Sequence, residues 1–399
     1  MTCWLRGFGL AVPNHSIAQA DAAELVSPFN ADTDEQARVL RALYLRAGVR
    51  RRHSVVLESS EPNSAIRQSF YSTRETQSRG PTTAERMQSY EHHAGSLAVT
   101  AARRAFAESG LEPSNITHLV TVSCSGFHAP GFDIELLQSA GLSPSVARTH
   151  VGFMGCHGAL NGLRVAAAFL QADPRANVLL CCVELCSLHH QYGWSPDRIV
   201  SNALFADGAA AVVLSARRGS LDPTASPTAG LPKESTPMRE TCGQPEWLGQ
   251  EAGHSAGERS WQLIASGSVV LPDTLDDMGW RIRDHGFEMT LSARVPELIK
   301  QHLRSWLGDW LGSRSLTVDD VCSWAFHPGG PRILSAAGEA LGLRREQWAV
   351  SESVLADFGN MSSPTILFIL DRLRQEGASG PCVALAFGPG LTIEAALLA

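Results

Sequence analysis

Hydrophobic residues in the first half of the chain predict a helix, a strand and a second helix in succession. Residues 94–107 carry apolar side chains at helical spacing, which predicts a helix with one buried face. A short turn leads to residues 116–124, an apolar and β-branched run typical of a buried strand. Beyond Pro130, residues 134–142 predict another helix.

The same order recurs in the second half of the chain. A predicted helix over residues 295–311 leads into residues 316–330, which contain a strand, and residues 331–343 then predict a helix. Ile116 and Val318 take matching places before the two strands. Because an internal repeat of this kind points to duplicated architecture, we predict an α/β protein built from two similar halves.

Further apolar runs are short enough to be strands, and they are residues 177–185, 209–216, 382–387 and 391–398. The last two flank Gly388–Pro389–Gly390, which predicts a tight turn between paired strands.

Two segments are polar and lack periodicity. Residues 217–261 are rich in Gly, Pro, Ser, Thr and Glu, and we predict a linker or surface excursion there. It would separate an N-terminal half, 1–216, from a C-terminal half, 262–399. Residues 58–86 have a similar composition, and we expect them to be exposed.

The composition, 44% hydrophobic and 18% charged, is ordinary for a globular protein. No apolar run reaches the roughly 18 residues of a membrane helix, and the N-terminus resembles no secretory leader. The nine cysteines lack paired spacing, which argues against a disulfide framework or a structural zinc site. We therefore expect a cytoplasmic protein that does not bind membranes.

The net charge of −7 gives no electrostatic reason to bind nucleic acid. An anionic ligand would need a local basic patch, and one is formed in the sequence by Arg46, Arg50, Arg51, Arg52 and His53.

Cys156 is the strongest candidate nucleophile. It lies between Gly155 and Gly158, just before a small and apolar segment that predicts a buried helix. A sulfur at a helix N-terminus is stabilised as a thiolate by free N–H groups and the macrodipole. The alternative is a small core residue, which is the usual role of an unpaired cysteine.

Two polar residues at other element ends complete a candidate site. His327 follows the predicted strand directly, where α/β proteins place chemistry, although it can simply bond the turn. Asn360 precedes a predicted helix, where the alternative is a turn residue. With Cys156 they suit thioester chemistry, because a thiolate takes the acyl group and two neutral donors hold an oxyanion or enolate.

These motifs resemble those of the type III polyketide synthases, the chalcone synthase-like branch of the thiolase superfamily. The likeness rests on five segments, GCHGALNG, HPGGP, GNMSSPTILFILD, NALFADGAAAVVL and AFGPGLTIE, and extends from about Arg46 to Leu398. The resemblance implies a thiolase-like αβαβα fold, a homodimer, acyl-CoA and malonyl-CoA substrates, and no metal or organic cofactor.

The resemblance also assigns roles to residues. Cys156 would carry the acyl group, His327 would activate it, and Asn360 would help His327 in the decarboxylation of malonyl-CoA. Phe205 matches an aromatic gate to the cavity, and Arg46 matches a position that binds CoA phosphates.

Several pocket positions depart from the plant chalcone-forming pattern, with Cys124, Cys186 and His189 in place of threonines, Trp280 for a glycine, Met289 for a phenylalanine, and Ala129 for a methionine that reaches across the dimer. They argue against chalcone formation, and the segment MGWRIRDHGFEMTLS resembles the microbial branch. Met289 and Ala129 enlarge the cavity for a fatty acyl starter and alkylpyrone or alkylresorcinol products, whereas the bulk of Trp280 favours a small or aromatic starter.

Other interpretations remain open. A carrier-protein-dependent 3-oxoacyl synthase has a similar cysteine, histidine and asparagine arrangement, but the segment AFGPGL disfavours it. A hydrolase lacks an acidic partner near His327, and a thiolase lacks a second cysteine within the last glycine-rich loop. A metal site at Cys186, His189 and His190 is disfavoured, because adjacent residues of an extended chain face opposite sides.

Overall fold

The structure, a computed structural model, describes residues 3–62, 64, 67–72, 79–217 and 260–399. Its helices are α1 Gln19–Asn30, α2 Asp34–Arg46, α3 Thr83–Ser109, α4 Phe132–Ala140, α5 Gly158–Ala172, α6 Pro196–Leu204, α7 Val295–Gly312, α8 Pro331–Leu341, α9 Ala349–Phe358 and α10 Pro364–Gln375. Its strands are β1 Trp4–Ala11, β2 Ser16–Ala18, β3 Arg51–His53, β4 His118–Ser123, β5 Ala147–Gly152, β6 Asn177–Leu185, β7 Asp207–Ser215, β8 Trp261–Val270, β9 Met278–Arg283, β10 Gly286–Leu291, β11 Ser323–Phe326, β12 Cys382–Gly388 and β13 Thr392–Leu398.

The main sheet consists of two parts with mirrored strand order, β5-β4-β6-β7-β1 followed by β8-β13-β12-β11. In the first part β1, β7 and β6 pair antiparallel, and β6 and β4 pair parallel. The second part repeats this pattern with β8, β13, β12 and β11. The two parts join where β1 pairs with the start of β8. The predicted pair of similar halves therefore recurs in the strand topology.

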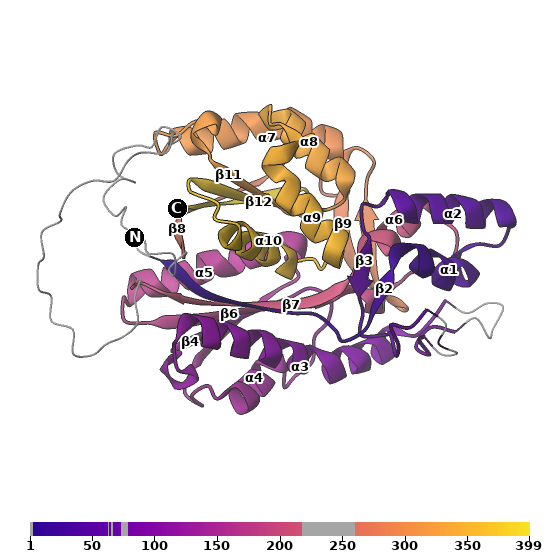
Figure 1. The fold of residues 1–399 in the computed structure, drawn as a ribbon, viewed down its shortest axis with the longest axis horizontal. Coiled ribbons are helices and arrows are strands. Elements are labelled where there is room, and N and C mark those ends of the chain that lie inside the picture. Colours follow the sequence, from indigo (N-terminus) through magenta and orange to yellow (C-terminus); the bar gives the residue numbers. More distant parts are fainter. Residues whose placement is uncertain (1–2, 63, 65–66, 73–78, 218–259) are drawn as a thin grey trace, which may run out of the picture.

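Helices and sheet parts are layered in the order helix, strand, helix, strand, helix (Figure 1). Helices α3 and α4 cover the outer face of the first part, and α7 and α8 that of the second. Helices α5 and α10 lie between the two parts and contact each other (Figure 1). Because these two helices pack on both sides, most of their residues are buried. The αβαβα fold predicted from the sequence is confirmed.

The matching of Ile116 with Val318 is wrong. Ile116 follows the 3₁₀ turn Pro113–Asn115 and lies just before β4, whereas Val318 opens the equivalent 3₁₀ turn before β11. The true counterpart of Ile116 is Val321, and both side chains are buried. The two residues were matched because each is an apolar residue next to a 3₁₀ turn, but Ile116 follows its turn and Val318 begins its turn.

The prediction that residues 58–86 are exposed is also partly wrong. Helix α3 begins at Thr83, well before the predicted start, because Thr82 and Glu85 form a reciprocal capping box. Arg86 on its first turns is fully buried, and Tyr71 is buried as well.

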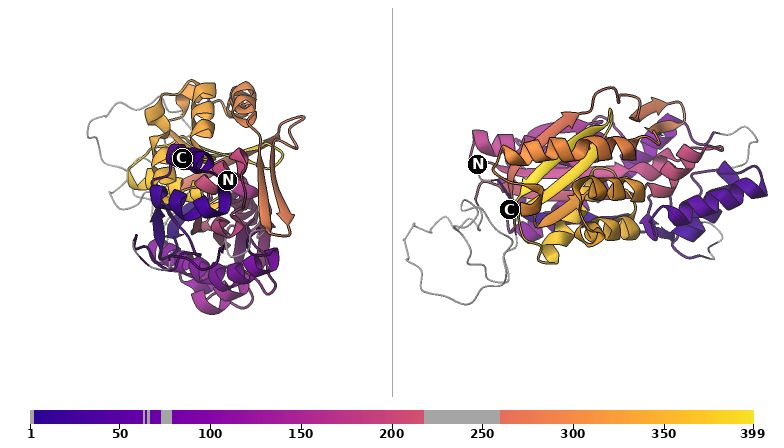
Figure 2. Two further views of the ribbon diagram at one scale, coloured as in Figure 1. Left: turned by 90° about the vertical axis from the view of Figure 1, so that its right-hand side faces the viewer. Right: turned by 90° about the horizontal axis from the view of Figure 1, so that it is seen from above.

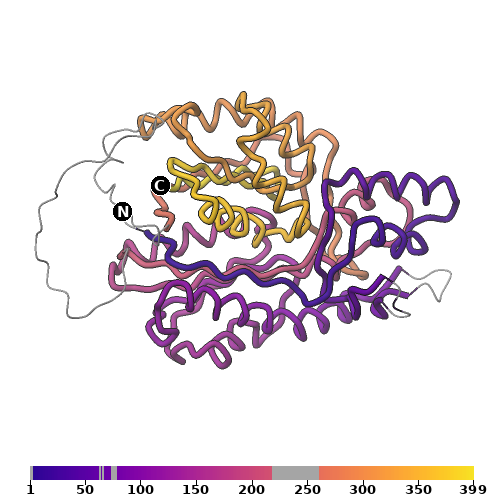
Figure 3. The backbone as a smooth tube through the Cα atoms, viewed as in Figure 1, coloured from indigo at the N-terminus to yellow at the C-terminus, as the bar shows by residue number. Residues whose placement is uncertain are grey.

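A hairpin and a helical excursion extend from the layered body. The hairpin of β9 and β10 runs beside the body from the second half toward α3 (Figure 2, left). Helices α1, α2 and α6 lie together at the end of the molecule opposite the two termini (Figures 1 and 3). Most of the predicted linker, residues 218–259, lies outside the described residues, and Trp261 at its predicted end already belongs to β8.

Among the described residues, no helix combines the length and hydrophobicity that crossing a bilayer requires.

Candidate active site

Cys156 lies in the 3₁₀ turn Gly155–His157, which leads directly into α5. The chain enters this turn through left-handed backbone at Phe153 (φ 56°) and Gly155 (φ 66°). A Cβ on Gly155 would lie 2.8 Å from the Pro389 ring, so only glycine allows the turn to dock on the β12–β13 hairpin. The sulfur therefore lies at the start of a buried helical segment, as predicted.

His327 follows β11 directly, and its side chain is only 1% exposed. Its backbone N–H donates to Leu385 O at 2.8 Å, which fixes the residue beside β12. Neither Nδ1 nor Nε2 of the ring has a hydrogen-bond partner among the described residues. Because a buried polar atom is costly when it stays unpaired, the ring is set to bond a ligand in the cavity that it lines.

Asn360 lies between α9 and α10 and forms an isolated parallel bridge with Phe205. Its Oδ1 accepts the backbone N–H of Ser362 at 2.8 Å. This bond assigns the oxygen and leaves the amide nitrogen as a donor, and the side chain also bonds Cys156. The bridge explains why two segments far apart in sequence meet beside the nucleophile.

The three candidate catalytic residues line one small cavity of about 20 Å³ together with Phe205 and Met289. A second cavity of about 20 Å³ adjoins it at Cys156 and is lined by Cys124, Cys186, Trp280, Phe205 and Met289 among others. Seven other residues predicted for the site therefore line the two cavities that meet at Cys156.

Burial dominates the ionisation of the central pair. It raises the pKa of the Cys156 thiol to about 11, although hydrogen bonds with Ser362 and Asn360 act in the opposite direction. Burial and the nearby His157 lower the pKa of His327 to about 3. Desolvation therefore opposes the thiolate that the helix start favours, and it favours the neutral imidazole of His327.

His189 and Ala129 do not line these cavities. His189 is buried behind the wall, stacked on Phe287 with ring centroids 4.2 Å apart. Ala129 is exposed and lines a separate cleft with Tyr90, Phe127 and other residues near the sheet edge.

Trp280 lies against the nucleophile side of the site. Its indole N–H donates to Cys124 O at 2.7 Å, and its ring lies 5.9 Å from that of Phe205. The large Trp280 side chain therefore forms part of the wall of the cavity at Cys156, where the sequence analysis expected it to take up space.

Arg46 lies in the last turn of α2 and lines a cleft of about 300 Å³. The cleft shares Leu204, Leu291, Gly329 and Ile333 with the catalytic cavity, so it leads from the surface to Cys156. Arg332, which the sequence analysis missed, lies in the same cleft after the HPGGP motif. Its signal was a cation beside a glycine-rich turn at a helix start.

The predicted basic patch does not exist as a single surface. Arg52 is buried and donates to the carbonyls of Asn202 and Phe205. Arg51 donates to Ser16 Oγ, and Arg50 pairs with Asp357. The patch is wrong because β3 alternates its side chains between opposite faces.

The sequence analysis also missed Glu184, a fully buried carboxyl at the end of β6. It accepts the backbone N–H groups of Cys124 (3.0 Å) and Ser125 (2.9 Å) and the hydroxyl of Ser363 (2.7 Å). Burial raises its pKa. The available signal was a single acidic residue within an otherwise apolar strand.

A larger apolar cavity, about 80 Å³, lies beyond Cys186 and Phe205. Its aliphatic wall comes mainly from α1 and from the segment after β3, through Ala22, Leu25, Val26, Val56 and Leu57. Cys186 and Phe205 line both this cavity and the one at Cys156, so the two spaces adjoin at these side chains.

Within the described ranges, no group of three or more His, Cys, Asp or Glu side chains is arranged to hold a metal ion. Cys186, His189 and His190 thus form no such group, and His190 instead bonds Asn30 Oδ1 at 2.8 Å.

Comparison with known families matches nearly the whole chain. Residues 3–218 match the N-terminal domain of chalcone and stilbene synthases, and residues 262–399 match the C-terminal domain of the same family.

Two curated relatives align with almost the whole of this chain and with most of their own lengths. The alpha-pyrone synthesis polyketide synthase-like Pks18 of Mycobacterium tuberculosis is 30% identical, over 98% of this chain and 90% of the relative. The 1,3,6,8-tetrahydroxynaphthalene synthase of Streptomyces peucetius subsp. caesius is 32% identical, over 97% and 90%.

Solved structures agree with these relatives. PKS-I from the brown alga Ectocarpus siliculosus has a TM-score of 0.84 at 28% identity, over 100% of this chain and 98% of the other. The 1,3,6,8-tetrahydroxynaphthalene synthase of Streptomyces coelicolor A3(2), a bacterial type III polyketide synthase, has a TM-score of 0.78 at 26% identity, over 99% and 98%. The thiolase-like fold is shared with them.

Proposed function

The chain belongs to the chalcone and stilbene synthase family and is a type III polyketide synthase, and we propose that it extends a fatty acyl starter on Cys156 to an alkylpyrone or alkylresorcinol. Enzymes of this class use acyl-CoA and malonyl-CoA, so the carrier-protein-dependent alternative is set aside. The observation that carries the proposed roles is the buried His327 beside Cys156, whose two ring nitrogens have no hydrogen-bond partner in the part of the chain that the structure describes.

Loading begins with a proton transfer. His327 takes the proton from the Cys156 thiol, and the sulfur attacks the acyl-CoA carbonyl. The new carbon–sulfur bond forms as the bond to the CoA sulfur breaks, and His327 returns the proton to that sulfur. The acyl-enzyme is left beside a neutral imidazole, in keeping with the low pKa of His327.

Extension uses the same neutral histidine as a donor. An N–H of His327 and the amide of Asn360 bond the thioester oxygen of malonyl-CoA, where negative charge develops as CO₂ leaves. The resulting enolate carbon attacks the acyl carbonyl on Cys156, and the carbon–sulfur bond of the acyl-enzyme breaks. An aspartate in place of Asn360 would repel the enolate, and the amide avoids that charge.

The cleft at Arg46 supports the route for CoA. Both Arg46 and Arg332 lie along a passage that reaches the catalytic cavity through Gly329 and Ile333. Their guanidinium groups suit phosphate at the outer end.

The apolar cavity beyond Cys186 and Phe205 supports a fatty acyl starter. Each methylene that enters it contributes about 0.8 kcal/mol, so a few methylenes favour medium or long chains over acetyl by a large factor. The relative Pks18 is named for alpha-pyrone synthesis. A movement of Phe205 would join this cavity to the one at Cys156.

A small starter such as malonyl-CoA or acetyl-CoA is the second candidate. It is favoured by the two cavities of about 20 Å³ at Cys156 and by the position of Trp280 in their wall.

We also propose a cytoplasmic homodimer. The sheet-edge strand β5 is partly exposed, and Phe127, Phe153 and Met154 nearby are 51%, 41% and 43% exposed. An apolar patch beside an open edge suits a subunit interface. The described cysteines are free thiols, as a reducing compartment requires.

The starter is tested by an acyl-CoA chain-length series with malonyl-CoA, using the native protein and Val26→Trp. Val26→Trp fills the apolar cavity, and the matched control Leu45→Trp adds the same ring on the exposed face of α2. We expect a native preference for long chains that Val26→Trp abolishes and Leu45→Trp keeps. A native preference for acetyl- or malonyl-CoA would establish the small starter instead.

A further inference from the structure

Arg86 is a fully buried arginine at the start of α3. Its Nε donates to Pro81 O at 2.8 Å, and one terminal nitrogen donates to Leu188 O at 2.6 Å and to His190 O at 3.1 Å. Among the described residues, no carboxylate pairs with it, and its other terminal nitrogen has no partner. Burying a cation costs free energy, and here no charge pair among the described residues offsets that cost. The hydrogen bonds to backbone carbonyls therefore indicate a structural role for Arg86.

The carbonyls that Arg86 holds flank His189. This arrangement fixes the 3₁₀ turn Cys186–His189 and so the direction of the His189 ring. Nδ1 of the ring accepts the backbone N–H of Phe287 at 2.9 Å, which makes Nε2 the protonated nitrogen. Nε2 then donates to Ser125 O at 2.6 Å. His189 thereby ties strand β10 to the loop that follows β4.

The ring of His189 stays neutral in this position. Burial, followed by the charge of Arg86, lowers its pKa to about 3. Both hydrogen bonds therefore persist across the ordinary working range of pH.

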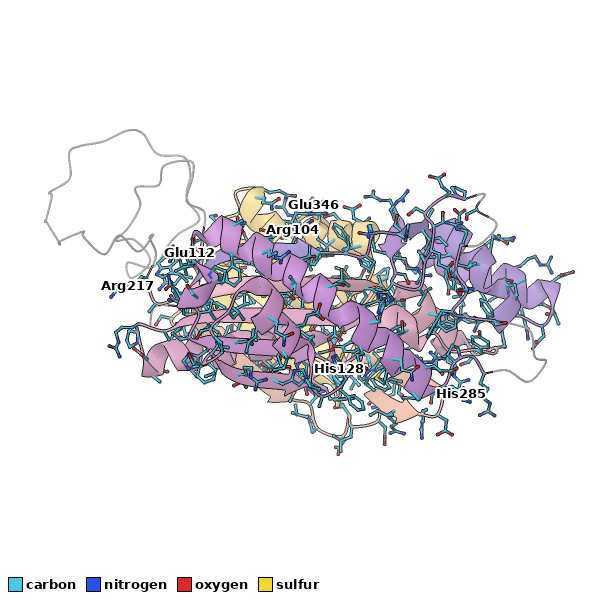
Figure 4. All side chains as sticks on the ribbon, turned by 90° about the horizontal axis from the view of Figure 1, so that it is seen from below. Arg104, Glu112, His128, Arg217, His285 and Glu346 are labelled. Atoms are coloured by element: carbon cyan, nitrogen blue, oxygen red, sulfur yellow. The ribbon has the colours of Figure 1, made fainter. Side chains whose placement is uncertain are left out.

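The turn of the β9–β10 hairpin is bonded to the start of α3. Thr83 N–H donates to Asp284 O at 2.8 Å, and Gly286 N–H donates to Thr83 Oγ1 at 2.8 Å. His285 Nδ1 lies 2.9 Å from Gly80 O, and Figure 4 shows His285 beside this end of α3. Gly286 (φ 95°) has no room for a side chain, because a Cβ would lie 2.8 Å from the guanidinium of Arg86.

The same hairpin carries the cavity wall. Trp280 on β9 and Met289 on β10 are directly paired across the strands. Trp280 donates to the carbonyl of Cys124, and His189 donates to that of the next residue, Ser125. The two rings also meet edge to face with centroids 5.5 Å apart.

We propose that Arg86 and His189 are positioning residues that fix the β9–β10 wall over Cys156 and thereby limit the length of the chain built there. The inference rests on the proposed polyketide extension and deepens it. Neither residue lines the cavity at Cys156, although His189 also lines the apolar cavity beyond Cys186. Arg86 lines none of these three cavities, so Arg86→Met reports the effect through Trp280 and Met289 alone.

The test compares product distributions of the native protein, His189→Leu and Arg86→Met with one starter and malonyl-CoA. Release of the wall raises the share of longer products about tenfold, the scale on which a pocket discriminates single methylene groups. The rate at which Cys156 takes up the starter stays within about twofold, because the loading residues are untouched. His189→Gln, whose amide can accept from Phe287 and donate to Ser125, restores the native distribution.

Leu136→Ala is the matched control, since it opens a cavity in the distant core beneath α3 and α4 and lowers the melting temperature without touching the wall. An unchanged distribution in His189→Leu, with a melting temperature lowered as in this control, would overturn the proposal.

If His189→Leu or Arg86→Met fails to fold, Arg86→Lys decides, because it keeps the charge and loses the fork of donors that bonds Leu188 O and His190 O. A native distribution in Arg86→Lys then contradicts the proposal, and a longer one supports it. Failure of the proposed function itself has a different signature, since the native protein would then gain no acyl group on Cys156.

Discussion

In the N-terminal half, strand β4 runs into Cys124 and the central helix α5 begins at the nucleophile turn; in the C-terminal half, the equivalent strand β11 runs into His327 and the equivalent helix α10 follows Asn360. The repeat thus places two strand ends and two helix starts around one point. One half contributes the sulfur, and the other contributes both neutral donors.

The surroundings of the two strand ends differ in how far their polar groups are paired. Glu184 accepts the backbone N–H of Cys124, so the first strand end is closed by hydrogen bonds. The ring of His327 at the second strand end lacks partners among the described residues. The two halves thus share a backbone frame, and they differ in that the His327 ring has no hydrogen-bond partner among the described residues. The proposed mechanism uses that ring to bond the substrate.

The most severe way to break the comparison is Cys156→Ala. We expect product formation to fall to background, because the proposed carrier of the acyl group is lost, while the fold persists because one small atom is removed. Product analysis with malonyl-CoA and an acyl-CoA measures the loss. The control Cys382→Ala, in the core of β12, should remain active. Full synthesis by Cys156→Ala would refute the covalent mechanism.

Removal of a donor from the other half should be nearly as severe. His327→Ala and Asn360→Ala each lose one hydrogen bond to the developing enolate, which reduces malonyl decarboxylation by about 10²–10³-fold. The release of CO₂ measures this step separately from loading. Loading should suffer more in His327→Ala, since only His327 takes the thiol proton. A native rate of CO₂ release in Asn360→Ala would refute its assigned role.

Local patterns in the sequence predicted most of the fold. Alternating helices and strands, the turn at Gly388–Pro389–Gly390 and the order of the two halves are all present. The start of α3 was missed because its capping box, Thr82 with Glu85, lies in a stretch whose composition resembles a loop.

The site was predictable as a set of residues, and its contacts were not. Motifs identified Cys156, His327 and Asn360, which line one cavity. Nothing local indicates that Phe205 bridges Asn360, or that His189 bonds Ser125 O and lies outside the two cavities at Cys156. Those contacts join residues distant in sequence, and burial decides them.

A milder change tests the cleft at Arg46 as the binding site for CoA. Arg46→Ala should raise KM for CoA substrates about tenfold, the scale of a lost charged hydrogen bond. The value of kcat should change by about twofold or less, because a phosphate contact far from the chemistry binds ground and transition states alike. Steady-state kinetics over a range of ionic strength measures both. An unchanged KM would return Arg46 to the role of a solvated surface residue.

The smallest expected effect concerns stability in acid. Burial lowers the pKa of His189, His190 and His327 to about 3, below the ordinary histidine value of 6.5. The unfolded chain therefore binds more protons than the folded one between these values. The contribution of these three rings to the free energy of unfolding is complete above about pH 6.5. It falls as the pH drops toward 3.

Chemical denaturation at pH 7.5 and pH 5.5 measures this loss. His189→Gln should show a smaller loss between these two pH values than the native protein, since it removes one of the three buried rings. An identical pH dependence in the two proteins would contradict the buried neutral state of His189.

The most direct measurement is the mass of the intact protein and of its peptides after incubation with an acyl-CoA, followed by addition of malonyl-CoA. If Cys156 carries the acyl group and His327 and Asn360 promote decarboxylation, one acyl group will be found on the peptide that contains Cys156. It will disappear when malonyl-CoA is added. Absence of that acyl group, or a persistent acyl group on Cys124 instead, would contradict it.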